Sequence, residues 1–168
     1  MKLTDVMPSE KWLEFAKSIY SKFGLNGAIY NKEGFLVHPR TPWANELCPI
    51  INGNKDSHFI CASAQQNLSA MAKEQKKPII GECDAGLIKI DVPIFVGNEF
   101  IGTAGGCGHL SEEGEVETFF ISKMLNIEEE RVKELLTTVK KMSQNELDEV
   151  VKYVENELEK ILSNFKNR

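Results

Sequence analysis

The fold of this chain is decided by residues Pro78 to Leu110, which have the sequence PIIGECDAGLIKIDVPIFVGNEFIGTAGGCGHL. Near the middle, Gly97-Asn98 separates two runs of strand-forming residues, Leu87–Val96 and Phe100–Cys107. A two-residue Gly-Asn loop between such runs is typical of a tight primed turn. We therefore predict an antiparallel hairpin in this stretch.

The two faces of this hairpin differ in polarity. Counting back from the turn places Ile88 opposite Cys107, and directly opposite residues point to the same side of a sheet. One face is then apolar, and its side chains are Ile88, Ile90, Val92, Ile94 and, at the far end, Cys107. The other face carries Lys89 and Asp91, and we expect it to be solvated or covered by polar groups.

The second strand of the hairpin is rich in glycine. Gly102, Gly105, Gly106 and Gly108 lie within seven residues, and glycine weakens a strand because it packs nothing against its neighbours. Three explanations stay open: a β-bulge, the close approach of a ligand or of another backbone, or the end of the strand. No helix follows at once, so the glycines do not predict a nucleotide-phosphate loop.

Length and composition are those of an ordinary globular protein. The 168 residues are 42% hydrophobic and 27% charged, which is enough for one core. The net charge of −5 gives no support for nucleic-acid binding. No run reaches the length of a membrane span and no signal peptide is visible, so we expect a cytoplasmic location. In that reducing compartment the four cysteines are expected to be thiols or metal ligands.

The rest of the chain mixes helical and strand patterns. Trp12, Phe15 and Ile19 recur at helical spacing and predict a helix over residues 9–23. A second hairpin is predicted over residues 26–38, and a further helix over about 56–76. Helices gathered around antiparallel hairpins predict an α+β fold, with flanking helices on a PAS-like antiparallel sheet and a long C-terminal helix.

A capping box of Ser143 and Glu146 begins that last helix. The apolar residues that follow are spaced alternately by four and three, and they are Leu147, Val151, Val154, Leu158, Ile161 and Phe165. This is the spacing of a coiled-coil seam. We predict a homodimer through this helix, and the alternative is that the helix packs on its own domain.

Several short motifs along the chain point to a known family. In order they are Leu47-Cys48, Cys61, Cys83-Asp84-Ala85-Gly86-Leu87, Val92-Pro93-Ile94 and a strand with Gly102 and Gly105-Gly106. This series resembles the PocR-type sensory domain, a PAS-like ligand-binding module of bacterial regulators. The resemblance covers about residues 12–110. The chain departs from the family pattern at Cys107, where a glutamine is expected after the paired glycines.

The resemblance implies a sensory module of bacterial signalling that binds a small organic molecule and does not catalyse a reaction. The regulator that gives the family its name responds to a small diol. A sensory core is expected at residues 1–110, followed at 111–168 by a helical segment for dimerisation or signalling. We expect the ligand to lie over the apolar face of the hairpin, oriented by Lys89 or Asp91. The predicted ligand-binding residues are Ile88, Ile90, Val92, Asp91, Gly105, Gly106 and Cys107.

The cysteines carry an alternative hypothesis. Cys48, Cys61, Cys83 and Cys107 contain no CxxC pair, so their spacing is a weak signal for a metal site. If the fold brings them over one face of the sheet, four thiolates would suit zinc or an iron–sulfur cluster, with His109 as a weaker fifth ligand. The chain would then sense redox state, a gas or a metal.

Two other interpretations of the cysteines remain. Each thiol can be a small buried hydrophobic group. A reactive-thiol sensor or enzyme would need a lowered thiol pKa. No Ser-His-Asp arrangement and no paired carboxylates can be recognised, so no enzymatic activity is predicted.

Overall fold

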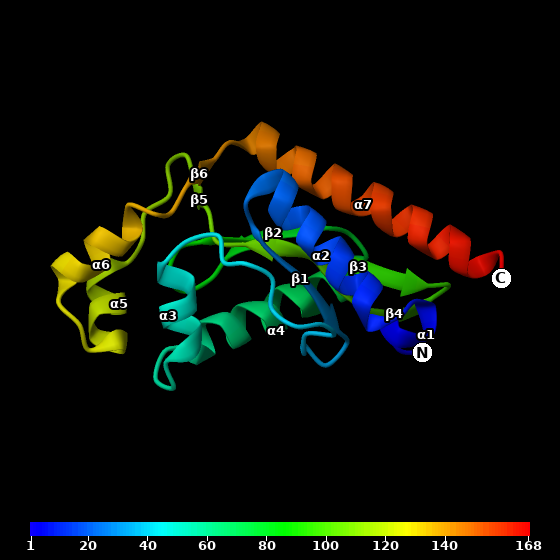
Figure 1. The fold of residues 1–168 in the computed structure, drawn as a ribbon, viewed down its shortest axis with the longest axis horizontal. Coiled ribbons are helices and arrows are strands. Elements are labelled where there is room, and N and C mark those ends of the chain that lie inside the picture. Colours follow the sequence, from blue (N-terminus) through cyan, green and yellow to red (C-terminus); the bar gives the residue numbers. More distant parts are fainter.

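The computed structural model describes residues 1–168 and has an α+β fold built on a four-stranded antiparallel sheet (Figure 1). This confirms the predicted fold class. The helices are α1 (Leu3–Val6), α2 (Ser9–Phe23), α3 (Leu47–Gly53), α4 (His58–Gln75), α5 (Thr118–Leu125), α6 (Glu129–Leu136) and α7 (Gln144–Lys166). The strands are β1 (Asn26–Asn31), β2 (Ile79–Glu82), β3 (Ile88–Val96), β4 (Glu99–Cys107), β5 (Leu110–Ser111) and β6 (Lys141–Met142).

The strand order in the sheet is β1-β4-β3-β2. The hairpin of β3 and β4 turns at Gly97 and Asn98 as predicted, with Val96 opposite Glu99. The predicted hairpin over residues 26–38 is wrong in its main pairing. β1 pairs with β4 instead, and only a single bridge from Tyr30 to Leu36 joins it to the following segment.

A β-bulge near the turn changes the register of the hairpin. Phe95 lies opposite Phe100, but the next residue back, Ile94, lies opposite Gly102, so Ile101 is left over on β4. A slip of one residue moves every later side chain of a strand to the other face. Cys107 consequently lies opposite Lys89, and the prediction that it faces Ile88 is wrong.

The glycines of β4 are explained by the close approach of neighbouring backbone as well as by the bulge. A Cβ atom at Gly105 would overlap the carbonyl oxygen of Ile90, and one at Gly102 would overlap the carbonyl oxygen of Tyr30. Two of the explanations offered above therefore hold together in this strand.

The apolar face of the sheet is filled by the protein's own helices. Ile88, Ile90, Val92 and Ile94 lie in a core of 19 buried residues with Trp12 and other side chains of α1, α2 and α7. In Figure 1, α7 lies on one side of the sheet and α4 on the other. The sheet is therefore covered on both faces, and the two coverings differ in chemistry.

The long helix α7 is part of this core. The capping box is present, with the Ser143 hydroxyl accepting from the Glu146 N–H at 3.2 Å. The residues that α7 buries are Leu147, Val150, Val154 and Leu158. Three of these belong to the predicted seam, and the remaining seam residues pack partly buried against the same core. The homodimer through α7 stays a prediction.

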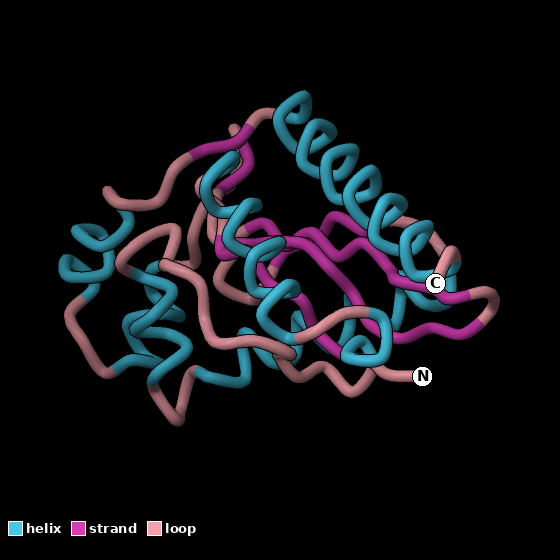
Figure 2. Tube along the Cα trace, turned by 45° about the vertical axis from the view of Figure 1, so that its right-hand side comes forward, coloured by secondary structure: helices cyan, strands magenta, loops and turns pink.

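A smaller second cluster lies at the end of the sheet near α3. Leu47 and Ile51 of α3 pack there with Ile121 of α5 and Val132 of α6. The strands β5 and β6 form a short parallel pair that joins this end to α7 (Figure 2). None of the helices combines the length and the hydropathy that crossing a membrane requires.

We expect Gly105→Ala to destabilise the protein by about 2 kcal/mol, because the added methyl group would press on the backbone of β3. Urea denaturation followed by circular dichroism measures this change. Gly53→Ala is the matched control, since a Cβ atom at that position meets nothing within 4 Å. Equal midpoints for Gly105→Ala and the unmodified chain would contradict the close approach.

Candidate functional site

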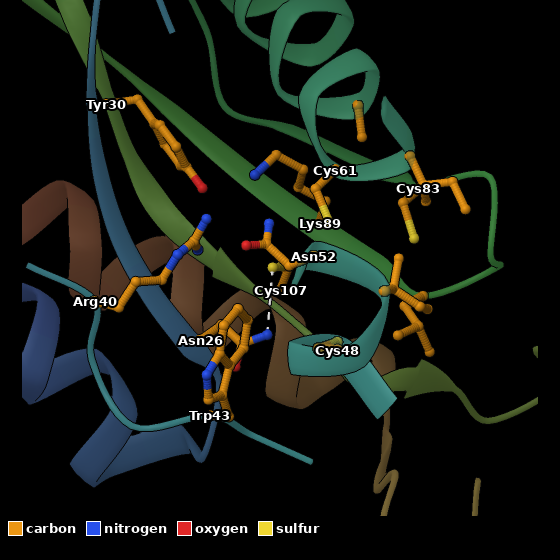
Figure 3. A pocket seen from close by; sticks show the side chains of 15 residues that line it. Asn26, Tyr30, Arg40, Trp43, Cys48, Asn52, Cys61, Cys83, Lys89 and Cys107 are labelled. Atoms are coloured by element: carbon orange, nitrogen blue, oxygen red, sulfur yellow. Dashed lines mark hydrogen bonds between the residues drawn. The ribbon is translucent and has the colours of Figure 1, made fainter. Parts of the chain in front are cut away.

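A cavity lies between α4 and the face of the sheet that α7 does not cover (Figure 3). Its empty volume is about 520 Å³, but this figure includes the part that opens toward solvent, and the enclosed part is small. The 15 residues that line it are Asn26, Tyr30, Arg40, Trp43, Cys48, Ile51, Asn52, Ile60, Cys61, Ala64, Cys83, Leu87, Lys89, Cys107 and Gly108.

Each wall of the cavity comes from a different part of the chain. The sheet contributes Lys89 from β3 and Cys107 from β4, which are direct neighbours in the register. Both side chains point toward α4 rather than into the apolar core. Lys89 does so by the alternation of β3, and Cys107 does so because of the bulge in β4. α3 contributes Cys48, α4 contributes Cys61, and the connection from β2 to β3 contributes Cys83.

All four cysteines thus line one cavity, and all four are free thiols. Amide groups approach two of the sulfur atoms. Asn45 Nδ2 lies 3.3 Å from Cys48 Sγ, and Asn26 Nδ2 lies 3.7 Å from Cys107 Sγ. No three His, Cys, Asp or Glu side chains come close enough together to hold a single metal ion.

Burial raises the pKa values of three of the four thiols. Burial raises the pKa of Cys83 to about 11, although backbone N–H groups oppose the change. Burial likewise raises the pKa of Cys48 and Cys61, and the proximity of Cys107 adds to it in both. These three groups are therefore protonated at neutral pH, which is unlike the low-pKa thiol that a reactive-thiol sensor requires.

Lys89 and Asp91 form a buried pair on the same face of β3. Lys89 is 5% exposed and Asp91 is 1% exposed. Lys89 Nζ lies 3.8 Å from Asp91 Oδ1, which is an ion-pair distance but too long for a hydrogen bond. Asp91 Oδ2 has no hydrogen-bond partner. The Lys89 ammonium also lies 4.9 Å from the centre of the Tyr30 ring, within the range of a cation–π contact.

The charge of Lys89 is maintained by its neighbours. Burial lowers the pKa of Lys89, but the attraction of Asp91, Tyr30 and Cys107 outweighs it, so the pKa of Lys89 lies above its ordinary value. Burial raises the pKa of Asp91, and Lys89 opposes that rise. The cavity wall therefore holds an ammonium group whose hydrogen-bonding capacity is not used within the protein.

A second, more open pocket adjoins the cavity. It shares Tyr30, Arg40, Asn52 and Cys61 with the cavity and is lined further by polar residues such as Gln65. Buried Gln65 donates to Thr103 Oγ1 at 3.1 Å, while its Oε1 atom has no partner. We call this the outer pocket. The shared residues place the outer pocket directly beside the cavity.

The residues predicted to bind the ligand divide into three groups. Ile88, Ile90 and Val92 lie in the core under α2 and α7 rather than in the cavity. The prediction that they lie beside a ligand is therefore corrected. Cys107 lines the cavity, as does Lys89. Three others lie in the same strands but do not line the cavity: Asp91, Gly105 and Gly106.

His109, the weaker metal candidate, does not line the cavity. Its ring is buried, and Nε2 lies 3.1 Å from the carbonyl oxygen of Gly24. Sequence reasoning also missed Tyr30, Arg40, Trp43 and Asn52. Arg40 and Trp43 lie in a proline-bounded loop without periodicity, where the Arg40 guanidinium lies 5.0 Å from the centre of the Trp43 ring. No sequence pattern indicates that this loop closes a cavity.

A comparison with protein-family models gives one match. The model described as "Sensory domain found in PocR" matches residues 5–165. The match extends well beyond residues 12–110 and includes α7. Neither curated proteins nor solved structures gave a significant match.

We expect Cys83 in the metal-free protein to react slowly with iodoacetamide near pH 8, because the thiolate is the nucleophile and its pKa is raised to about 11. The reaction rate should keep increasing above pH 9, where an ordinary thiol levels off. Mass spectrometry of the modified peptide measures the rate at each pH. The urea-unfolded chain is the control, and a native rate that levels off near pH 9 would contradict the raised pKa.

Proposed function

The chain belongs to the family of sensory domains found in PocR, and on that premise we propose that it senses a small organic molecule bound in the cavity between the sheet and α4. A sensory family also favours a role without catalysis. The organic nature of the ligand, its place in the cavity and the cytoplasmic location are parts of this proposal.

The observation that carries the proposal is the state of Lys89. A buried ammonium ordinarily has both a counter-ion and hydrogen-bond acceptors, because removal from water is unfavourable without them. Lys89 has a counter-ion at 3.8 Å and faces the cavity. A ligand oxygen there would supply the missing acceptor, and Arg40 lines the same space.

The chemistry of the walls describes the ligand. Ile51, Ile60 and Leu87 offer an apolar surface, while Lys89 and the amide of Asn52 offer hydrogen-bond donors. Such a site suits a short carbon chain that bears a hydroxyl, carbonyl or carboxylate oxygen. The ligand class expected from the family resemblance, a small diol, has this chemistry.

A path from the cavity to α7 supports the sensory role. Gly108 lines the cavity at the end of β4, and Leu110 begins β5 two residues later. The Leu110 N–H donates to the carbonyl oxygen of Lys140 at 2.9 Å, and β5 pairs with β6 directly before α7. A ligand that moves the end of β4 would therefore move the start of α7.

We expect a short diol or hydroxy acid to bind, and Lys89→Met to weaken that binding about tenfold or more, since a hydrogen bond to a charged group is lost. Calorimetric titration of the metal-free chain with propane-1,2-diol and with lactate measures the affinity. Lys77→Met is the matched control, because Lys77 is exposed and lies outside the cavity.

A second variant separates binding from folding. Lys89→Met leaves Asp91 buried without its counter-ion, whereas Lys89→Met combined with Asp91→Asn removes both charges and is expected to fold more stably. Circular dichroism confirms that each variant is folded. Unchanged affinity in both folded variants would overturn the role of Lys89, and no binding of any such compound by the unmodified chain would overturn the ligand class.

A further inference from the structure

The cavity collects every cysteine of the protein. The cavity is lined by 15 of the 168 residues, yet these include all four thiols, from α3, from α4, from the connection between β2 and β3, and from the end of β4. A cysteine that serves only as a small hydrophobic group packs into a core. Cys48 packs with Leu87 and Leu110, and Cys61 and Cys83 pack against buried clusters, but all four cysteines also surround one space that protein atoms do not fill (Figure 3).

Two of the thiols have an amide group beside the sulfur atom. Asn45 and Asn26 direct amide N–H groups toward the sulfur atoms of Cys48 and Cys107. Amide donors around cysteine sulfur are a usual feature of metal–thiolate centres, where they stabilise the negative charge on sulfur.

Cations are placed to balance such a centre. Lys89 and Arg40 line the same cavity, and Lys89 lies directly opposite Cys107 in the register of β3 and β4. A cluster with four thiolate ligands carries a net negative charge, and its burial is unfavourable without nearby positive groups. This arrangement of charge suits thiolates better than it suits neutral thiols.

The spacing of the thiols decides between one metal ion and several. Four thiolates on one zinc ion each lie about 2.3 Å from it and therefore crowd together. No three of the possible ligands in this protein are so close. In a cluster of four iron atoms and four sulfides each cysteine binds a different iron atom, so the cysteine sulfur atoms stand farther apart.

We infer that Cys48, Cys61, Cys83 and Cys107 ligate an iron–sulfur cluster in this cavity. Two ferrous ions, two ferric ions and four sulfides enter without any change of oxidation state, each cysteine forms one Fe–S bond, and each of the four thiols releases its proton to solvent. The cluster and the organic ligand proposed above are alternative occupants of one cavity, because Lys89 and the four cysteines line the same space. Tyr30 and Arg40 lie on the side of the cavity away from Cys48 and Cys83 (Figure 3).

Metal analysis of the chain tests the inference. The protein is purified without oxygen, reconstituted with equal amounts of ferrous and ferric iron and with sulfide, and desalted. We expect about four iron atoms and about four sulfides per chain, with a broad visible absorbance band that air or dithionite bleaches. Cys83→Ser and Cys107→Ser should each lose most of the iron and the band, whereas the control His109→Gln should keep both, because His109 does not line the cavity.

Other outcomes overturn the inference. About one zinc and no iron per chain would replace the cluster by a single-ion site, and absence of iron and sulfide would leave four buried thiols. Retention of the cluster by both serine variants would exclude these ligands. Cys83→Ala and Cys107→Ala, checked by circular dichroism, guard against misfolding of the serine variants. The diol and lactate titrations use metal-free protein, so failure of the cluster leaves the proposed ligand binding testable on its own.

Discussion

The structure depends on one extra residue in β4. Because Ile101 has no partner across the hairpin, the far end of the strand presents its other side to α4. Without that bulge Cys107 would lie in the apolar core beside Ile88, and Lys89 would have no cysteine for a neighbour. β-bulges commonly re-aim side chains next to functional sites. Here the bulge moves Cys107 from the sheet face that packs in the core to the face that lines the cavity.

The sheet face that lies under α4 buries polar groups. It buries a lysine and an aspartate whose polar atoms are only partly satisfied, together with Gln65, which has one unpartnered oxygen. A buried ion pair contributes little net stability, because the desolvation of both charges offsets their attraction. Apolar residues of similar size would stabilise this face better. The retained charges fit a surface that serves recognition, while the 19-residue core on the other face supplies the stability.

Local patterns predicted most of the fold. The helix over 9–23, the turn at Gly97 and the capping box of α7 follow from residues close in sequence, and all three are present. The register of β4 was predicted wrongly, because a bulge is a local irregularity that alternation does not record. The error placed Cys107 on the face of Ile88. The ligand was placed on Ile88, Ile90 and Val92 for another reason, that their face is apolar, but the 19-residue core fills that face. The loop with Arg40 and Trp43 was not predicted as a cavity wall, since only tertiary contacts bring it there.

The position of α7 has a thermodynamic consequence. Leu147, Val150, Val154 and Leu158 complete the core beneath the sheet, so α7 cannot leave without exposing that face to water. The docking of α7 and the shape of the cavity are then linked equilibria. A partner that binds α7 and shifts its docking would change the affinity for the ligand by some factor. By the reciprocity of linkage, the ligand would change the affinity for that partner by the same factor. Under the proposed function, α7 would then both carry the outgoing signal and set the sensitivity of the sensor.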